Sequence, residues 1–153
     1  MKSTLLTLLT ASALSVSSMV QAEDYVTNYQ EIVKAANWEK MKTVSVELQD
    51  YEYVGTLEFE QGQPYKLQIK NTSQDNKKHY FTAPEFFRNI ATRKAQVNGQ
   101  AEIKTHYFTA LEVLPGGQLD LYFVAQNRGQ FPLYCTEGDH REKEGMEDTV
   151  VIK

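Results

Sequence analysis

One short segment near the C-terminus concentrates side chains that can bind a metal ion. It reads CTEGDHREKEGM and contains Cys135, His140 and Met146. Cys135 is the only cysteine of the 153-residue chain, so it has no disulfide partner within the chain. A thiolate, an imidazole and a thioether together favour a soft or borderline ion. The composition of this segment therefore suggests a metal site with sulfur ligands.

A second histidine would complete a known ligand set. Two histidines, one cysteine and a weak axial methionine are the ligands of blue-copper electron-transfer sites. The sequence HYFTA occurs twice, at 79–83 and at 106–110, and each copy begins with a histidine. His79 follows a strand-like segment and a polar turn, whereas His106 precedes a strand-like segment. Spacing alone leaves both histidines open as the missing ligand.

Each of these side chains also has an ordinary structural explanation. A single cysteine in a β-sandwich is most often a small buried hydrophobic residue, a methionine is often core, and a loop histidine is often solvated. Their joint occurrence between two predicted strands makes the metal hypothesis more specific than any one of them. A Cys–His nucleophilic enzyme would need an oriented base and an oxyanion site, and structural zinc would favour more thiolates without methionine. No further motif supports catalysis, so we expect no enzyme.

The N-terminal segment predicts export from the cytoplasm. In MKSTLLTLLTASALSVSSMVQA, one lysine precedes an apolar run that ends in small residues, which is the layout of a secretory signal peptide. The apolar run is too short and too interrupted by Thr and Ser to span a bilayer. We predict a signal peptide at 1–22, cleavage after Ala22, and one mature domain at 23–153 located in the periplasm.

The mature chain is acidic. Without Lys2 it carries fifteen Lys and Arg against twenty Asp and Glu. This balance argues against binding to nucleic acid or to anionic membrane surfaces and favours partners with a basic surface. A chain of about 130 residues can bury roughly two thirds of its unfolded surface, so it does not need disulfides to fold.

Hydrophobic periodicity predicts an all-β domain with two helical segments. A short amphipathic helix is expected at about 28–40, within an N-terminal extension that spans 23–42. A helical insertion is expected in TAPEFFRNIATRKAQ, where Thr82 and Glu85 fit a capping box and Asn98-Gly99 ends the helix. Strand-like periodicity covers 42–48, 55–71 with a turn at Gly62 and Pro64, 107–114, 119–126, 131–135 and 147–153. The pattern favours an antiparallel sandwich or barrel.

From about Thr43 onwards, the mature sequence resembles the cupredoxins, the small secreted blue-copper proteins related to azurin and plastocyanin. The resemblance rests on GQPYKLQIKN followed by HYFTAPEFF, on LPGGQLDLYFVAQNRGQFPLYC, and on GDHREKEGM leading into TVVIK. It implies a cupredoxin-like antiparallel Greek-key β-sandwich that binds one copper ion per chain at one end.

The resemblance also implies which residues bind copper. Three ligands lie near one plane and the fourth is weak and axial: His79, Cys135, His140 and Met146. His106 matches no ligand position. The family pattern further implies that the backbone N–H of Tyr80 points at the cysteine sulfur and tunes the reduction potential. Four residues separate Cys135 from His140, as in azurin-like loops, but five separate His140 from Met146, slightly more than is usual.

Three functions follow as hypotheses. The resemblance implies one-electron transfer between Cu(I) and Cu(II), with a redox partner that has a basic surface, such as a cytochrome. A second hypothesis is a periplasmic copper-tolerance protein that sequesters or oxidises excess copper among other copper-handling proteins, because Asp139 and Arg141 flank His140 where apolar residues are common. A third, a metal-free binding module, would leave the cysteine unexplained.

Overall fold

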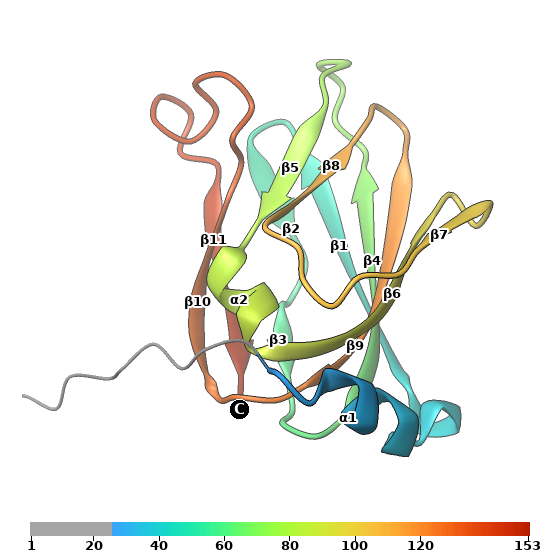
Figure 1. The fold of residues 1–153 in the computed structure, drawn as a ribbon. Helices are drawn as coiled ribbons and strands as arrows, with labels where there is room; N and C mark the ends of the chain where they lie inside the picture. Colours follow the sequence, from blue (N-terminus) through green and yellow to red (C-terminus); the bar gives the residue numbers. More distant parts are fainter. Residues whose placement is uncertain (1–25) are drawn as a thin grey trace, which may run out of the picture.

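The computed structural model describes residues 26–153, so the predicted signal peptide lies outside the described residues. Two β-sheets pack face to face and enclose the core (Figure 1). One sheet has six strands in the order β2 (Glu52–Val54), β1 (Lys42–Gln49), β4 (Pro64–Asn71), β9 (Gln118–Ala125), β6 (Ile90–Val97) and β7 (Ala101–Ile103). The other has five, in the order β3 (Glu58–Phe59), β11 (Glu147–Ile152), β10 (Gly129–Tyr134), β5 (His79–Thr82) and β8 (Ala110–Val113). The predicted β-sandwich is confirmed.

Most neighbouring strands are antiparallel, but two pairs are parallel. β1 lies parallel to β4, and β3 lies parallel to β11. Parallel neighbours need a longer connection than a hairpin. Between β1 and β4 the chain forms β2, crosses to the other sheet as β3, and then returns. The chain therefore connects the two sheets covalently, in addition to the packing between them.

The core follows the two-residue period of the strands. In β4 the side chains alternate between buried and partly exposed, and Leu67 and Ile69 are fully buried. Aromatic rings fill the centre between the sheets, with Phe59 and Phe123 at a centroid distance of 5.1 Å. Burial of apolar area at about 25 cal/mol per Å² is the main stabilising contribution in such a core. The sandwich is thus a rigid support for the loops at its ends.

The predicted N-terminal helix is present but divided. Helix α1 spans Tyr29–Ala35 and a 3₁₀ turn, η1, spans Trp38–Lys40. The break lies at Ala36, which is extended, and at Asn37, whose side chain accepts a hydrogen bond from the Glu39 N–H. The Trp38 ring lies under the guanidinium of Arg93 in β6, at 4.5 Å, and so holds this extension on the six-stranded sheet. None of the helices in residues 26–153 is long and apolar enough to cross a membrane.

The predicted helical insertion is much shorter than expected. Helix α2 spans only Pro84–Arg88, and the following residues form β6. The predicted capping box is wrong, because Ala83 occupies the N-cap position and makes no side-chain cap. Thr82 instead ends β5, and its hydroxyl lies 3.3 Å from that of Thr136. Phe86 and Phe87 do form the buried side of the helix.

Strand pairing explains why the helix stops. β6 makes an antiparallel ladder with β9 that continues from Ile90 to Val97, with a β-bulge between Thr92 and Lys94. Tertiary hydrogen bonds along a neighbouring strand outweigh the weak helix propensity of this segment. Asn98 and Gly99 do not end a helix but form the β6–β7 turn, both with positive φ (48° and 70°).

Candidate metal centre

Three of the four predicted ligands meet at one end of the sandwich. The ligand atoms of His79, Cys135 and His140 all lie within 4.8 Å of one another. The Cys135 sulfur is 3.9 Å from Nδ1 of His79 and 3.6 Å from Nδ1 of His140. The three residues are 0%, 1% and 5% exposed, respectively. One thiol and two imidazoles in this arrangement could hold one metal ion.

Neighbouring strands of the five-stranded sheet bring His79 and Cys135 together. His79 is the first residue of β5, and Cys135 directly follows β10, whose last residue, Tyr134, pairs with Thr82 of β5. On its other side, β5 pairs with β8, so that Val113 lies opposite His79. The sequence pattern did not indicate β5, because it has only four residues and runs directly into the start of α2.

The loop between β10 and β11 is closed by its own backbone. The Cys135 N–H donates to the Met146 carbonyl at 3.1 Å, and the Met146 N–H donates to the His140 carbonyl at 2.9 Å. Gly138 and Gly145 have φ of 48° and 70°, a backbone region that favours glycine. The loop and the β4–β5 connection lie at the same end of the sandwich (Figure 1). The two backbone hydrogen bonds fix the position of His140 within the loop.

Met146 and His106 are placed differently. Met146 is fully buried and belongs to the core, and its backbone is bonded to both Cys135 and His140. Its side chain therefore starts at the same end of the sandwich as the other three, and its role as an axial ligand stays a prediction. His106 lies outside the cluster, where its ring stacks on Tyr29 of α1 at 5.2 Å.

The predicted contact to the cysteine sulfur is present. The Tyr80 N–H donates to the Cys135 sulfur at 3.4 Å. Burial raises the pKa of the Cys135 thiol, and the backbone N–H groups of Tyr80 and Glu137 oppose this shift only in part. Without a cation the sulfur is therefore held as a thiol at neutral pH. A metal ion would displace that proton, since the thiolate is the form that binds metals.

The outer nitrogen of His79 has polar partners. Nε2 lies 3.1 Å from the Ser73 hydroxyl and 3.5 Å from Oδ1 of Asp75. Burial lowers the pKa of His79, the nearby Asp75 carboxylate opposes this shift, and His140 adds to it. Burial also raises the pKa of Asp75, but hydrogen bonds from Lys77 and Ser73 together with His79 outweigh it and leave that pKa below its ordinary value. The imidazole is thus kept neutral, as a metal ligand must be.

His140 lies next to the surface. Its ring meets the Tyr51 ring edge to face at a centroid distance of 5.0 Å. Tyr51 has a positive φ of 75°, which is unusual for an aromatic residue. An open pocket of about 390 Å³ covers this region and is lined by Tyr51, Lys77, Glu137, Gly138, Asp139, His140, Lys143 and Glu144. The surface around His140 is therefore charged, as the sequence indicated.

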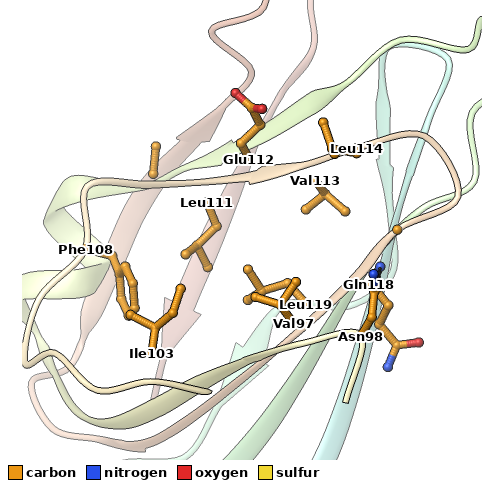
Figure 2. A pocket seen from close by; sticks show the side chains of 12 residues that line it. Val97, Asn98, Ile103, Phe108, Leu111, Glu112, Val113, Leu114, Gln118 and Leu119 are labelled. Carbon is orange, nitrogen blue, oxygen red and sulfur yellow. Dashed lines mark hydrogen bonds between the residues drawn. The ribbon is translucent and has the colours of Figure 1, made fainter. Parts of the chain in front are cut away.

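A second pocket, of about 400 Å³, is lined by a different set of residues (Figure 2). It opens between β8 and the strands β6, β7 and β9, and apolar side chains line it, including Ile103, Phe108, Leu111 and Leu119. The Glu112 carboxylate points away from the cavity. Its lining contains no histidine, cysteine or methionine, so this pocket offers none of the ligands of the candidate metal centre.

No protein-family model and no curated protein sequence matches this chain. Among solved structures, a multicopper oxidase from Campylobacter jejuni, described as a metallo-oxidase, is 14% identical, with a TM-score of 0.53 over 73% of this chain and 30% of that one. McoA multicopper oxidase from Aquifex aeolicus is 11% identical, with a TM-score of 0.56 over 76% of this chain and 30% of that one. Auracyanin from Roseiflexus castenholzii is 18% identical, with a TM-score of 0.48 over 77% of this chain and 98% of that one.

The likeness to the two oxidases shows the fold. The chain spans 30% of the length of each of them, and at such low identity a shared fold carries no shared activity. The architecture is the cupredoxin-like β-sandwich that the sequence resemblance predicted.

Proposed function

We propose that this chain is a type 1 copper protein that binds one copper ion through His79, Cys135 and His140, with Met146 as a weak axial ligand. The observation that carries the proposal is the buried cluster in which both Nδ1 atoms face the cysteine sulfur at 3.9 Å and 3.6 Å. Bound copper would supply a one-electron change between Cu(I) and Cu(II). Two imidazoles and one thiolate are ligands acceptable to both oxidation states.

The donor set fits copper better than the alternatives. A structural zinc site would use four ligands, commonly with two or more cysteines, whereas the chain has one cysteine. The Tyr80 N–H and the apolar core around Met146 supply the outer contacts that tune such a site. Strand β5 and the β10–β11 loop would keep the three donors in place while an electron arrives or leaves.

The proposed role is electron transfer rather than catalysis. The three donors are at most 5% exposed, so a substrate would have little access to a metal ion between them. Of the three donors, His140 is the one that lines the charged pocket, so an electron would pass between the cluster and the surface through it. A partner would bind there, and the acidic side chains of Glu137, Asp139 and Glu144 favour a basic surface such as that of a cytochrome.

We also propose that the protein is exported to the periplasm, on the evidence of its N-terminal sequence. A second candidate role is copper tolerance, in which the protein sequesters or oxidises excess copper. The charged surface around His140 favours this role, because it lacks the apolar docking surface common among carriers of this type.

The proposal is tested by loading the mature protein, residues 23–153, with copper. We expect one copper ion per chain by elemental analysis and reversible one-electron reduction in a potentiometric titration. Copper that is bound but cannot be cycled would contradict electron transfer and favour sequestration. Zinc retained in preference to copper would contradict the proposed metal.

A further inference from the structure

A network of polar side chains, none of them a proposed ligand, contacts the outer nitrogen of His79. It is formed by Asn71, at the end of β4, and by Ser73 and Asp75 in the β4–β5 connection. Asn71 is 2% exposed, and its side-chain amide donates to the carbonyls of Lys77 and Val113 at 2.8 Å and 2.9 Å. These bonds attach the connection to β8. The segment that leads into His79 is therefore held on both sides.

The positions of the acceptors determine which nitrogen of His79 carries the proton. The Ser73 hydroxyl lies 2.9 Å from Oδ1 of Asn71 and 2.8 Å from Oδ1 of Asp75, and both of these oxygens can only accept. The single hydroxyl proton must go to one of them. Ser73 Oγ is then left as an acceptor towards Nε2 of His79, at 3.1 Å. Nε2 therefore carries the hydrogen, and the Nδ1 lone pair faces the cysteine sulfur.

Asp75 adds a negative charge to this network. Its Oδ1 accepts from the Lys77 N–H at 2.9 Å and lies 3.5 Å from Nε2 of His79. Its Oδ2 is buried and has no hydrogen-bond partner among residues 26–153. The Asp75 side chain is 16% exposed, so water screens its charge only in part, and the charge acts at short range on the imidazole and on whatever the imidazole binds.

The β1–β2 turn holds Asp75 in place. Asp50 accepts hydrogen bonds from the backbone N–H groups of Gln74 at 2.8 Å and Asp75 at 3.3 Å. The next residue, Tyr51, lies against His140. One turn therefore contacts the surroundings of both histidines, and the backbone of Asp75 cannot move away from it without breaking these bonds.

We propose that Ser73 and Asp75 are positioning residues that fix His79 as the Nε2–H tautomer, and that the Asp75 carboxylate lowers the reduction potential of the bound ion. The second half rests on the proposed copper function. A carboxylate beside an imidazole ligand raises the basicity of that ligand. A nearby negative charge also stabilises Cu(II) more than Cu(I), because the oxidised ion has the larger positive charge.

The tautomer is tested on the metal-free mature protein, so this test does not depend on copper. Nitrogen-15 NMR of the histidine rings should show Nε2 of His79 protonated at neutral pH. A double variant with Ser73→Ala and Asp75→Ala removes both acceptors and should give a mixture of tautomers. A wild-type protein with the proton on Nδ1, or a double variant with the wild-type spectrum, would overturn the positioning role.

The charge is tested by Asp75→Asn, in which an amide oxygen can still accept from Ser73 and Lys77. The control is Asp120→Asn, which removes one carboxylate from the outer face of the other sheet, where it is bonded to Gln118. We expect a higher midpoint potential in Asp75→Asn and no change in the control. Ser73→Ala keeps the charge and should weaken copper binding about 10- to 100-fold with a smaller change of potential.

Equal potentials in Asp75→Asn and in the control would overturn the charge effect. If the wild-type protein binds no copper, the proposed function fails and the effect on the potential fails with it. The NMR result for the metal-free protein then still decides the positioning of His79.

Discussion

At the scale of single residues, the candidate metal centre has outer contacts from groups that are not proposed ligands. The Tyr80 N–H contacts the cysteine sulfur, and Ser73 and Asp75 contact the outer nitrogen of His79. Such outer contacts orient the donors before a metal arrives. The donors are therefore ordered when the protein folds, and a metal ion does not have to order them on binding.

Met146→Leu tests the weak axial role. The two side chains have similar volumes, so the substitution at this fully buried position should cost less than about 1.5 kcal/mol of stability. We expect copper to remain bound and the midpoint potential to rise, because the axial thioether tunes the ion rather than holding it. Copper analysis and voltammetry measure both effects. Loss of all copper would show that Met146 is a principal ligand.

The pH dependence of the metal-free protein tests the environment of His79. Its pKa is lowered in the folded state, so between that value and the unfolded value of about 6.5 the unfolded chain binds more protons. Stability should therefore fall as the pH is lowered from about 6.5. His79→Gln should show a smaller fall in urea unfolding between pH 7 and pH 5. If the free energy of unfolding falls equally with pH in both proteins, a group other than His79 causes the pH dependence.

The candidate ligands and the contact from the Tyr80 N–H could be predicted from the sequence and its family resemblance, but the contacts of Ser73 and Asp75 could not. The spacing of Cys135 and His140 pointed to a metal site, and the family resemblance selected His79 over His106. Ser73 and Asp75 lie in TSQDNKK, a polar run that reads as an ordinary solvated turn. Their proposed positioning role depends on the attachment of Asn71 to β8, a contact between residues 42 positions apart that no local sequence pattern contains.

At the scale of elements, α2 shows what hydrophobic periodicity can and cannot predict. The apolar residues of PEFFR correctly indicated a helical turn, and Phe86 and Phe87 are buried as expected. The continuation into β6 was missed, because Ile90 and Ala91 fit a helix face as well as a strand. Only the ladder with β9 decides between the two. The strand β5, which begins at His79, was missed because it has only four residues.

Phe86→Ala tests the contribution of α2 to the core. The ring is fully buried and packs on Phe59 at 5.7 Å and on Phe123 at 5.4 Å. Removing it should lower the free energy of unfolding by about 3–5 kcal/mol. Phe86→Leu, which retains most of the apolar volume, should cost clearly less. Urea unfolding compares the three proteins, and a loss below about 1 kcal/mol for the alanine variant would contradict this packing.

At the scale of the whole molecule, the hydrophobic core and the candidate metal site occupy different parts of the sandwich. The core lies between the sheets, and the candidate site lies where β5 and the β10–β11 loop meet at one end (Figure 1). This end is acidic, because the loop and its continuation contain more acidic than basic residues. The acidic side chains are Glu137, Asp139, Glu142, Glu144, Glu147 and Asp148, and the basic ones are Arg141 and Lys143.

The charge of this end should control the rate of electron exchange. A small cationic reagent, such as hexaammineruthenium, should react faster at low salt and slow down as ionic strength rises. An anionic reagent, such as hexacyanoferrate, should show the opposite dependence. Stopped-flow measurements on the copper-loaded protein compare the two. Rates that do not depend on salt would mean that electrons leave the protein away from the acidic end.

The most direct test of the central claim is a Cu(II) titration of the mature protein followed by visible absorption, with Cys135→Ser as the control. We predict an intense thiolate-to-copper band that saturates at one ion per chain, together with a type 1 electron paramagnetic resonance spectrum. The serine variant should lack the band, because a hydroxyl does not replace the thiolate as a donor. A colourless wild-type protein, or a band that survives in the variant, would contradict the assignment of Cys135 as a copper ligand.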